Sequence, residues 1–268
     1  MAEHDSKGLI PRQPYIQINT KDYEYIVVQK TGISQFYEFT DITKNRPINA
    51  VPDGCVDLVF AIGENGVKSY IGGTVLKLKY WPLEDSHTYF GVRFQPGECV
   101  LPHELKIEDI INTDLELNCN SYGKSLGEQL AEAHNLYERS NIFMQYYLLN
   151  IRNLQVSDGV KGIESYVRNK IYETKGEIPI KEIAAQTGYS ECYVRRAFHE
   201  VHGISPKTFE KIVRFQNLLE IMSIEEAEAL REIAMEGGYF DQSHMMKEFK
   251  SFMGMTPEKY QNIFAKKK

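Results

Sequence analysis

Two copies of one sequence pattern occupy the C-terminal part of this 268-residue chain. Ile183-Ala184-x-x-x-Gly188-Tyr189 recurs fifty residues later as Ile233-Ala234-x-x-x-Gly238-Tyr239. After one added residue near Phe240, five further positions match with a shift of 51. They are Val194, Phe198, Gly203, Pro206 and Phe209, which correspond to Met245, Phe249, Gly254, Pro257 and Tyr260. Such self-similarity indicates a supersecondary unit that is present twice.

Each copy has the pattern of two helices joined by a tight turn. In the first copy Gly188 supplies the turn, and Ser190 is the expected N-cap of the second helix. In the second copy Gly238 and Asp241 take these positions. The sequence therefore predicts helix-turn-helix units at about residues 180–202 and 230–253.

A long helix from Pro206 to about Met222 is expected to connect the two units. Its inward-facing residues should be Phe209, Ile212, Val213, Leu218 and Leu219. A rigid connector fixes the distance between the second helices of the units. If both helices enter the major groove of DNA, they should lie about one turn, roughly 34 Å, apart.

Polar and basic side chains are expected on the outward faces of the two second helices, where they would contact DNA. These candidates are Cys192, Tyr193, Arg195, Arg196 and His199 in the first unit, and Gln242, Ser243, His244, Met246, Lys247 and Lys250 in the second. Each could alternatively be a solvated surface residue. Arg196 and Lys247 occupy matching positions, so they are the first candidates. The tail Lys266-Lys267-Lys268 reads as a solubilising end.

The charge is distributed unevenly along the chain. The net charge is −6, which by itself argues against a nucleic-acid partner. Residues 159–268, however, hold 17 Lys and Arg against 16 Asp and Glu, a net charge of +1. The placement of the cations must therefore decide whether phosphates can bind.

The N-terminal part reads as strands followed by helices. Tyr23–Lys30, Val56–Ile62 and Tyr89–Phe94 are strand candidates, separated by turn signals such as Gly63-Glu64-Asn65-Gly66. Short strands at this spacing suggest a sandwich or barrel. Helical periodicity begins at Ser125, in helices that either pair two subunits or cover the sheet. With a linker at 155–159, the expected fold is α+β in two domains, at residues 1–155 and 156–268.

The second copy resembles the signature of the AraC/XylS family of transcription regulators. The resemblance lies in Gly238-Tyr239-Phe240-Asp241-Gln242-Ser243-His244-Met245-Met246-Lys247-Glu248-Phe249-Lys250 and Gly254-Met255-Thr256-Pro257-Glu258-Lys259-Tyr260. It extends over about residues 161–260 and implies seven helices with two helix-turn-helix units in one monomer. It also implies double-stranded DNA as a partner, and an activator that contacts RNA polymerase.

The front part resembles the N-terminal domain of some regulators of this family. The matching stretches are Val51-Pro52-Asp53-Gly54-Cys55-Val56-Asp57-Leu58-Val59-Phe60 and Phe90-Gly91-Val92-Arg93-Phe94-Gln95-Pro96-Gly97. The resemblance implies a cupin-like β-domain, and no ligand follows from it. We expect this domain either to sense a small-molecule effector or to form a homodimer. Asp53, Asp57 and Arg93 are its candidate ligand-binding residues. Arg93 is either a buried ion-pair partner of one of these aspartates or an anchor for a ligand carboxylate.

The sequence offers little support for an enzyme. It has no Gly-x-Ser-x-Gly, no P-loop and no His-x-His of a cupin metal site, so no metal or cofactor is expected. His87, Glu98 and His103 could line a pocket, but the two histidines read as surface or hydrogen-bonded residues. A DNA-repair alkyl-transfer protein is an alternative, although Cys55, Cys99, Cys119 and Cys192 are scattered.

Neither a signal peptide nor a long apolar segment is visible in the sequence. We therefore expect a cytoplasmic protein without a membrane partner. One further alternative stays open, in which the protein is an effector-independent DNA-binding module.

Overall fold

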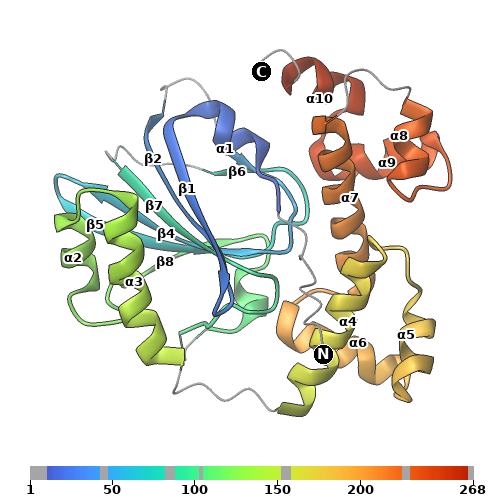
Figure 1. Ribbon diagram of the computed structural model, residues 1–268, viewed down its shortest axis with the longest axis horizontal. Helices are drawn as coiled ribbons and strands as arrows, with labels where there is room; N and C mark the ends of the chain where they lie inside the picture. Colours follow the sequence, from blue (N-terminus) through green and yellow to red (C-terminus); the bar gives the residue numbers. More distant parts are fainter. Residues whose placement is uncertain are drawn as a thin grey trace, which may run out of the picture.

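The computed structural model describes residues 11–42, 48–81, 88–102, 105–151, 158–224 and 230–264. A β-rich N-terminal domain stands beside an all-helical C-terminal domain, which confirms the predicted two-domain α+β fold (Figure 1). The end of the expected linker was predicted two residues too late. Residues 155–157 lie outside the described residues, but Asp158 and Gly159 already belong to α4 (Asp158–Glu173), because helical hydrogen bonding begins there despite the glycine.

The N-terminal domain is built on a six-stranded antiparallel sheet with the strand order β1-β2-β7-β4-β5-β8. Its strands are β1 (Thr20–Lys30), β2 (Ile33–Ile42), β4 (Val56–Gly63), β5 (Gly66–Gly72), β7 (Thr88–Phe94) and β8 (Asp114–Leu117). The three predicted strands correspond to β1, β4 and β7. The predicted turn joins β4 and β5 in a hairpin that pairs Gly63 with Gly66. A second sheet pairs β3 (Ile48–Ala50) with β6 (Lys79–Trp81).

Side chains of the large sheet alternate between two apolar cores, as the strand period requires. On one face, Phe36, Phe60 and Phe90 pack against Phe143 and Tyr147 of α3 (Leu136–Ile151). The short helix α2 (Leu126–Glu132) contributes to the same core through its buried leucines. The two helices therefore cover the sheet. Whether they also pair two subunits stays a prediction.

The opposite face of the large sheet is covered by the second sheet and by α1 (Pro14–Asn19). Ile16 of α1, Ile48 of β3 and Trp81 of β6 pack with Phe39 and Tyr89 of the large sheet. This arrangement of two facing sheets agrees with the predicted cupin-like domain. A 3₁₀ helix, η1 (Ile107–Ile110), follows β7 and leads into β8.

Seven helices make up the described part of the C-terminal domain, the number implied by the resemblance. After α4 they are α5 (Ile180–Thr187), α6 (Glu191–His202), α7 (Pro206–Ile224), α8 (Leu230–Glu236), α9 (Gln242–Met253) and α10 (Pro257–Phe264). In Figure 1, α7 runs along the middle of this domain, with α5 and α6 near one end and α8 and α9 near the other. The predicted connector is therefore confirmed.

The connecting helix α7 is buried along most of its length. The five residues predicted to face inward are all at most 2% exposed. Polar residues of α7 are buried as well, because other segments approach it from several sides. Arg214, for example, donates to the carbonyl of Gly176 at 3.0 Å, which ties α7 to the turn between α4 and α5.

The two domains meet along α7. Gln216 accepts a hydrogen bond from the Arg12 amide and donates one to the carbonyl of Pro52, each at 2.7 Å. The ring of Phe209 lies so close to Gly54 that a Cβ atom there would be 2.7 Å from it. The loop between β3 and β4 is therefore fitted against the connecting helix.

A buried charge network forms another part of this domain interface. Arg168 of α4 pairs with Glu164 at 2.8 Å and also with Glu98, which follows β7 in the N-terminal domain. Glu164 in turn lies 2.7 Å from His202, the last residue of α6. Both partners of this second contact are almost fully buried. The network thus connects the N-terminal domain to α6 through α4.

The N-terminal domain reaches the C-terminal ends of α6 and α9. Gly203 ends α6 and lies against Ile111, which follows η1. The Leu78 amide donates to the carbonyl of Phe252 in α9 at 2.6 Å. Both helix-turn-helix units are therefore held by the same N-terminal domain.

Candidate DNA-binding surface

The turn and cap of each helix-turn-helix unit have the predicted geometry. Gly188 and Gly238 have φ angles of 73° and 74°, in the left-handed region that favours glycine. Ser190 caps α6 by accepting a hydrogen bond from the Tyr193 amide at 3.3 Å. Asp241 caps α9 by accepting one from the His244 amide at 2.7 Å. These local signals fix where each second helix begins.

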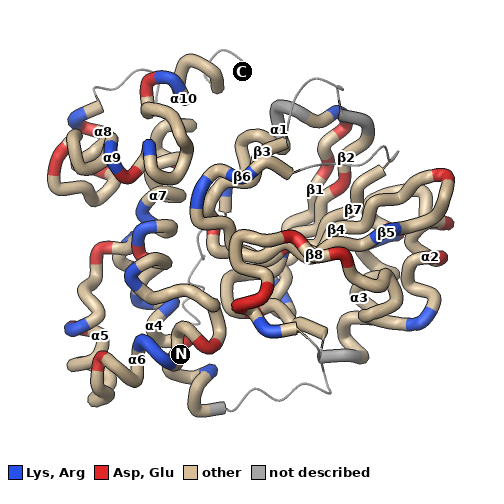
Figure 2. The backbone as a smooth tube through the Cα atoms, turned by 180° about the vertical axis from the view of Figure 1, so that it is seen from behind, with Lys and Arg blue, Asp and Glu red and all other residues tan. Residues whose placement is uncertain are grey.

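One stripe of each second helix is buried and the other is exposed. Val194, Ala197 and Phe198 of α6 lie in the domain core, as do Met245 and Phe249 of α9. The predicted DNA contacts lie on the opposite stripes. Cys192, Arg195, Arg196, His199, Gln242, Ser243, His244, Lys247 and Lys250 are exposed, whereas Tyr193 and Met246 are half-buried. Figure 2 shows Lys and Arg on both α6 and α9.

The basic residues of α6 are held by neighbouring side chains. The Arg196 guanidinium lies 5.4 Å from the ring centroid of Tyr193, which in turn packs on Tyr189 at 4.8 Å. Arg195 pairs with Glu191 one turn earlier at 3.0 Å. This pair is about half exposed, so water screens it and Arg195 can exchange its partner for a phosphate.

The α9 surface differs from that of α6. Lys247 and Lys250 have no ion-pair partner in the part of the chain that the structure describes. The tyrosines after the turn glycines also differ, since Tyr189 is 52% exposed and Tyr239 only 5%. The added residue, Phe240, is 93% exposed. Neither Tyr189 nor Phe240 was among the predicted contacts.

The candidate ligand residues of the N-terminal domain lie in and beside a buried ion-pair cluster. Arg93 donates to both carboxylate oxygens of Asp57, at 2.9 Å each, and lies 3.7 Å from Asp53. Burial alone would lower the pKa of Arg93, but the two carboxylates outweigh it and raise that pKa well above its ordinary value. The predicted ion pairs are therefore present.

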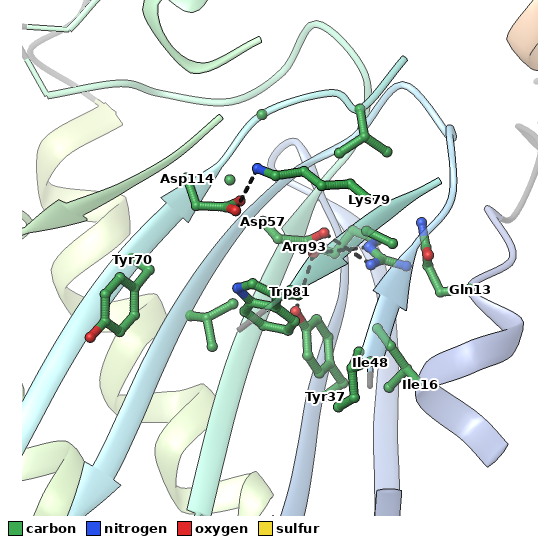
Figure 3. A pocket seen from close by; sticks show the side chains of 15 residues that line it. Gln13, Ile16, Tyr37, Ile48, Asp57, Tyr70, Lys79, Trp81, Arg93 and Asp114 are labelled. Atoms are coloured by element: carbon green, nitrogen blue, oxygen red, sulfur yellow. Dashed lines mark hydrogen bonds and ion pairs between the residues drawn. The ribbon is translucent and has the colours of Figure 1, made fainter. Parts of the chain in front are cut away.

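A cavity of about 50 Å³ adjoins this cluster between the two sheets (Figure 3). Asp57 and Arg93 line it together with Tyr37 and Trp81. Lys79 of β6 forms an ion pair with Asp114 of β8 at 2.5 Å across another part of the wall. Sequence reasoning missed these additional wall residues, since they come from strands that it did not identify.

Two other polar candidates, Asp53 and Glu98, do not line the cavity. Asp53 contacts Arg93, but its carboxylate accepts hydrogen bonds from the Cys55 amide and the Gln13 side chain instead of lining the wall. Glu98 is paired with Arg168 at the domain interface, so its assignment to a pocket was wrong. His87 and His103 lie outside the described residues, as does the Lys266–Lys268 tail.

Sequence comparisons identify both parts of the chain. Residues 174–263 match a helix-turn-helix domain family, and residues 31–116 match a domain of unknown function (DUF6597). The first match includes both repeat copies and the connector between them.

Residues 174–263 form an AraC-type helix-turn-helix domain. This confirms the AraC/XylS resemblance. A search of curated proteins gives no significant match to the sequence.

Several solved structures are similar to this chain at low overall scores. ToxT from Vibrio cholerae is 12% identical over 90% of this chain and 98% of its own, with a TM-score of 0.43. A DNA-binding transcriptional dual regulator from Escherichia coli K-12 is 22% identical over 38% of this chain and 96% of its own, with a TM-score of 0.34. The DNA-binding domain of AdpA, solved with a target DNA, is 16% identical over 41% and 97%, with a TM-score of 0.35.

The four cysteines lie in different environments, both in the AraC-type domain and in front of it. Cys55 is buried, Cys99 and Cys119 are partly buried, and Cys192 is exposed on α6; none forms a disulfide. Burial raises the pKa of the Cys55 and Cys99 thiols, which makes both less reactive. Among the described residues, no three His, Cys, Asp or Glu side chains are grouped to hold a metal ion. No described helix is long and apolar enough to cross a membrane.

Proposed function

We propose that this protein is a sequence-specific transcription regulator in which α6 and α9 enter adjacent major grooves of double-stranded DNA. The observation that supports this proposal is the matched pair of exposed, polar and basic stripes on two capped helices of one AraC-type domain. The N-terminal residues of a recognition helix contact base edges. In the first turns, Cys192 of α6 and Gln242, Ser243 and His244 of α9 are exposed.

The length of α7 fits this proposal. Its 19 residues correspond to a helix of about 28 Å. The second helices adjoin its two ends, so their separation is comparable to the roughly 34 Å of one DNA turn. Because α7 is buried on most sides, the separation is fixed before DNA binds. A fixed separation reduces the entropy that binding would otherwise cost.

The candidate contacts divide by chemistry into two roles. Arg196, Gln242 and Ser243 can donate to base edges, and Arg is the usual partner of guanine. Lys247 and Lys250 are exposed ammonium groups suited to phosphates. This division places sequence discrimination at the start of α9, through Gln242 and Ser243, and in the middle of α6, through Arg196.

Binding to a DNA duplex selected from a random library by the full-length protein tests the proposal. Arg196→Ala should lose about 1–3 kcal/mol at one position of the site if Arg196 reads a base. Lys247→Ala should weaken binding uniformly and reduce the salt slope by about 1 if Lys247 holds a phosphate. Lys30→Ala on β1 removes the same charge from the N-terminal domain and should leave affinity unchanged.

Two results would contradict this function. Wild-type affinity in both the Arg196→Ala and Lys247→Ala proteins would refute the placement of DNA on α6 and α9. Failure of footprinting to find any protected duplex, at low salt and with candidate effectors present, would refute DNA binding itself.

We also propose that the protein is cytoplasmic and is not an enzyme, and that its N-terminal domain regulates DNA binding by taking up a small-molecule effector. The cavity beside Arg93 adjoins the domain interface, since the side chain of Gln13 in its wall holds Val51 while the neighbouring Arg12 contacts Gln216 of α7. A volume of about 50 Å³ has room for only a few water molecules, so a metabolite must displace wall residues. Such displacement is a route to the DNA-binding helices.

A thermal-shift screen of metabolites against the full-length chain tests this regulation, because a ligand that binds the native state raises its apparent stability. A stabilising ligand should also change DNA affinity. In Ala50→Leu, whose larger side chain fills part of the cavity, the ligand should neither raise the melting temperature nor change DNA affinity. Stabilisation without any change in DNA affinity would favour an effector-independent DNA-binding module.

Activation of transcription through RNA polymerase, with homodimers on the DNA, completes the proposal. In a purified transcription reaction the protein should increase transcript yield from a promoter that contains its site. A decrease would make it a repressor. Light scattering with and without DNA would establish whether two subunits assemble.

A further inference from the structure

The second helix-turn-helix unit exposes an aromatic ring that its own fold does not use. Phe240 is 93% exposed, more than any other large apolar side chain described. It is also the residue that lengthens the second repeat relative to the first. In both copies three residues separate the N-cap from the first core residue of the second helix, so the addition lies between Tyr239 and the cap.

The two copies use their aromatic residues differently. Tyr189 directly precedes the cap of α6, and its ring is half exposed and packs on Tyr193. The matching Tyr239 is buried, with the Arg214 guanidinium 5.5 Å from its ring centroid. The added Phe240 then takes the place before the cap of α9. Each unit therefore presents an exposed aromatic ring immediately before its second helix.

We propose that Phe240 is an apolar DNA contact, which packs on thymine methyl groups or deoxyribose at the edge of the groove that α9 enters. This inference rests on the proposed DNA-binding function. Apolar side chains, Phe included, discriminate thymine by contact with its methyl group, and Phe wedges also occur between base steps.

The polar surroundings of Phe240 favour DNA as the occupant. The carboxylate beside it, that of Asp241, accepts the His244 amide and so serves as the helix cap. The next side chains along the chain, Gln242 and Ser243, are exposed hydrogen-bonding groups, and the Lys247 ammonium follows on the same helix. The ring therefore lies at the start of a row of exposed hydrogen-bond donors, with an exposed ammonium group further along the same helix, and this row is the surface that the proposed function assigns to DNA.

Affinity measurements with the full-length protein and its selected duplex test this contact. Phe240→Ala should weaken binding about tenfold, and the loss should be concentrated at one end of the site. The slope of affinity against salt should stay at the wild-type value, because an apolar contact releases no counterions. Lys247→Ala, in contrast, should reduce that slope by about 1.

Two matched variants separate the contact from general effects. Met235→Ala removes another exposed apolar side chain, which is 69% exposed on α8 before the turn, and should leave affinity within twofold of wild type. Phe240→Leu keeps an apolar group and should retain most of the affinity. Because Phe240 and Met235 both pack against little of the protein, Phe240→Ala, Phe240→Leu and Met235→Ala should all melt at the wild-type temperature.

The possible outcomes are distinct. Wild-type affinity and footprint in Phe240→Ala would overturn the DNA contact while leaving the proposed function intact. Unchanged DNA affinity with lost transcription activation would show that the ring contacts a protein, and would overturn it as well. If the wild-type protein protects no duplex at all, the proposed function fails, and this contact fails with it.

Discussion

Single buried charges show how much of this protein depends on residue pairs that are far apart in sequence. Arg93 on β7 is 2% exposed and satisfies Asp57 on β4 through two parallel hydrogen bonds. A buried carboxylate without a partner is costly, whereas the intact pair contributes little net stability. The pair therefore contributes more to the arrangement of β4 and β7 beside the cavity than to the total stability.

Replacing Arg93 alone should be far more damaging than replacing the pair. Arg93→Met leaves Asp57 and Asp53 without their cation, and we expect a loss of about 3–5 kcal/mol in the free energy of unfolding. Arg93→Met combined with Asp57→Leu should recover much of that loss. Urea unfolding of the three proteins measures both effects. Equal loss in the single and double variants would contradict the explanation.

His202 gives a second prediction, for the dependence of stability on pH. Burial lowers its pKa below the ordinary value near 6.5, although the facing carboxylates of Glu164 and Glu98 act in the opposite direction and Arg168 assists burial. Just below pH 6.5 the unfolded chain therefore binds a proton at His202 that the folded chain does not. This contribution to stability is present above pH 6.5 and is lost as the pH falls below it.

Melting curves between pH 7.5 and about 5.5 check this prediction. The wild-type protein should melt at progressively lower temperature below pH 6.5, and His202→Gln should show a smaller decline. Glu164 does not titrate in this window, since its pKa is lowered from an ordinary value of 4.5 by the contacts with His202 and Arg168, which outweigh its burial. Identical declines would assign the effect to other groups.

Helix caps are the next scale of organisation, because each one determines the start of a DNA-reading helix. Asp241→Ala should destabilise the protein by about 1 kcal/mol, since the His244 amide loses its acceptor. Asp241→Asn retains an acceptor and should cost much less. Ser190→Ala is the equivalent test for α6. Chemical denaturation of these variants, with DNA affinity measured alongside, would show whether fraying of the first turn reaches the contacts.

Those caps also explain which parts of the fold could be predicted from the sequence. The turn glycines, the cap residues and the long helix after Pro206 depend on neighbours within a few residues, so the sequence shows them directly. The strands β1, β4 and β7 were visible for the same reason. By contrast, β3 and β6 are three residues each and pair with one another across about 30 residues of chain.

Long-range partners could not be predicted in this way. Glu98 has a charged side chain of the kind that lines ligand pockets. Only the folded structure, in which α4 approaches it, reveals that Arg168 is its partner. The outward turn of Phe240 was hidden as well, because either aromatic residue after Gly238 could have filled the core. An added residue between the turn and the cap was the one available signal. It indicated a local difference without its direction.

At the scale of the whole molecule, the domain interface is the feature that sequence gave no reason to expect. The close contact between Gly54 and the ring of Phe209 provides a test of its role. Gly54→Ala should push the domains apart, because the new Cβ atom would be 2.7 Å from the ring and φ is 82°. We expect the two domains of the wild-type protein to unfold in a single thermal transition, and those of Gly54→Ala to unfold in two.

Gly66→Ala is a matched control for this change. Gly66 also has a positive φ, of 107°, but a Cβ atom there would meet nothing within 4 Å. The control should therefore show only the backbone strain, with a small decrease in melting temperature and a single transition. Calorimetry of both variants distinguishes them. Two transitions in the control, or one in Gly54→Ala, would argue against a tight domain contact.

Val51 and Tyr15 belong to the same apolar cluster as Phe209 and Ile183 of the AraC-type domain. Part of the helical core is thus supplied by the other half of the chain. Grafting residues 158–268 onto an unrelated sensor would uncover that apolar surface, and the hybrid should be less stable and tend to self-associate. A useful chimera would have to keep the loop of residues 51–54 with the helices it covers. A chimera of this protein should therefore be divided inside the N-terminal domain, and not at the junction between the N-terminal and C-terminal domains.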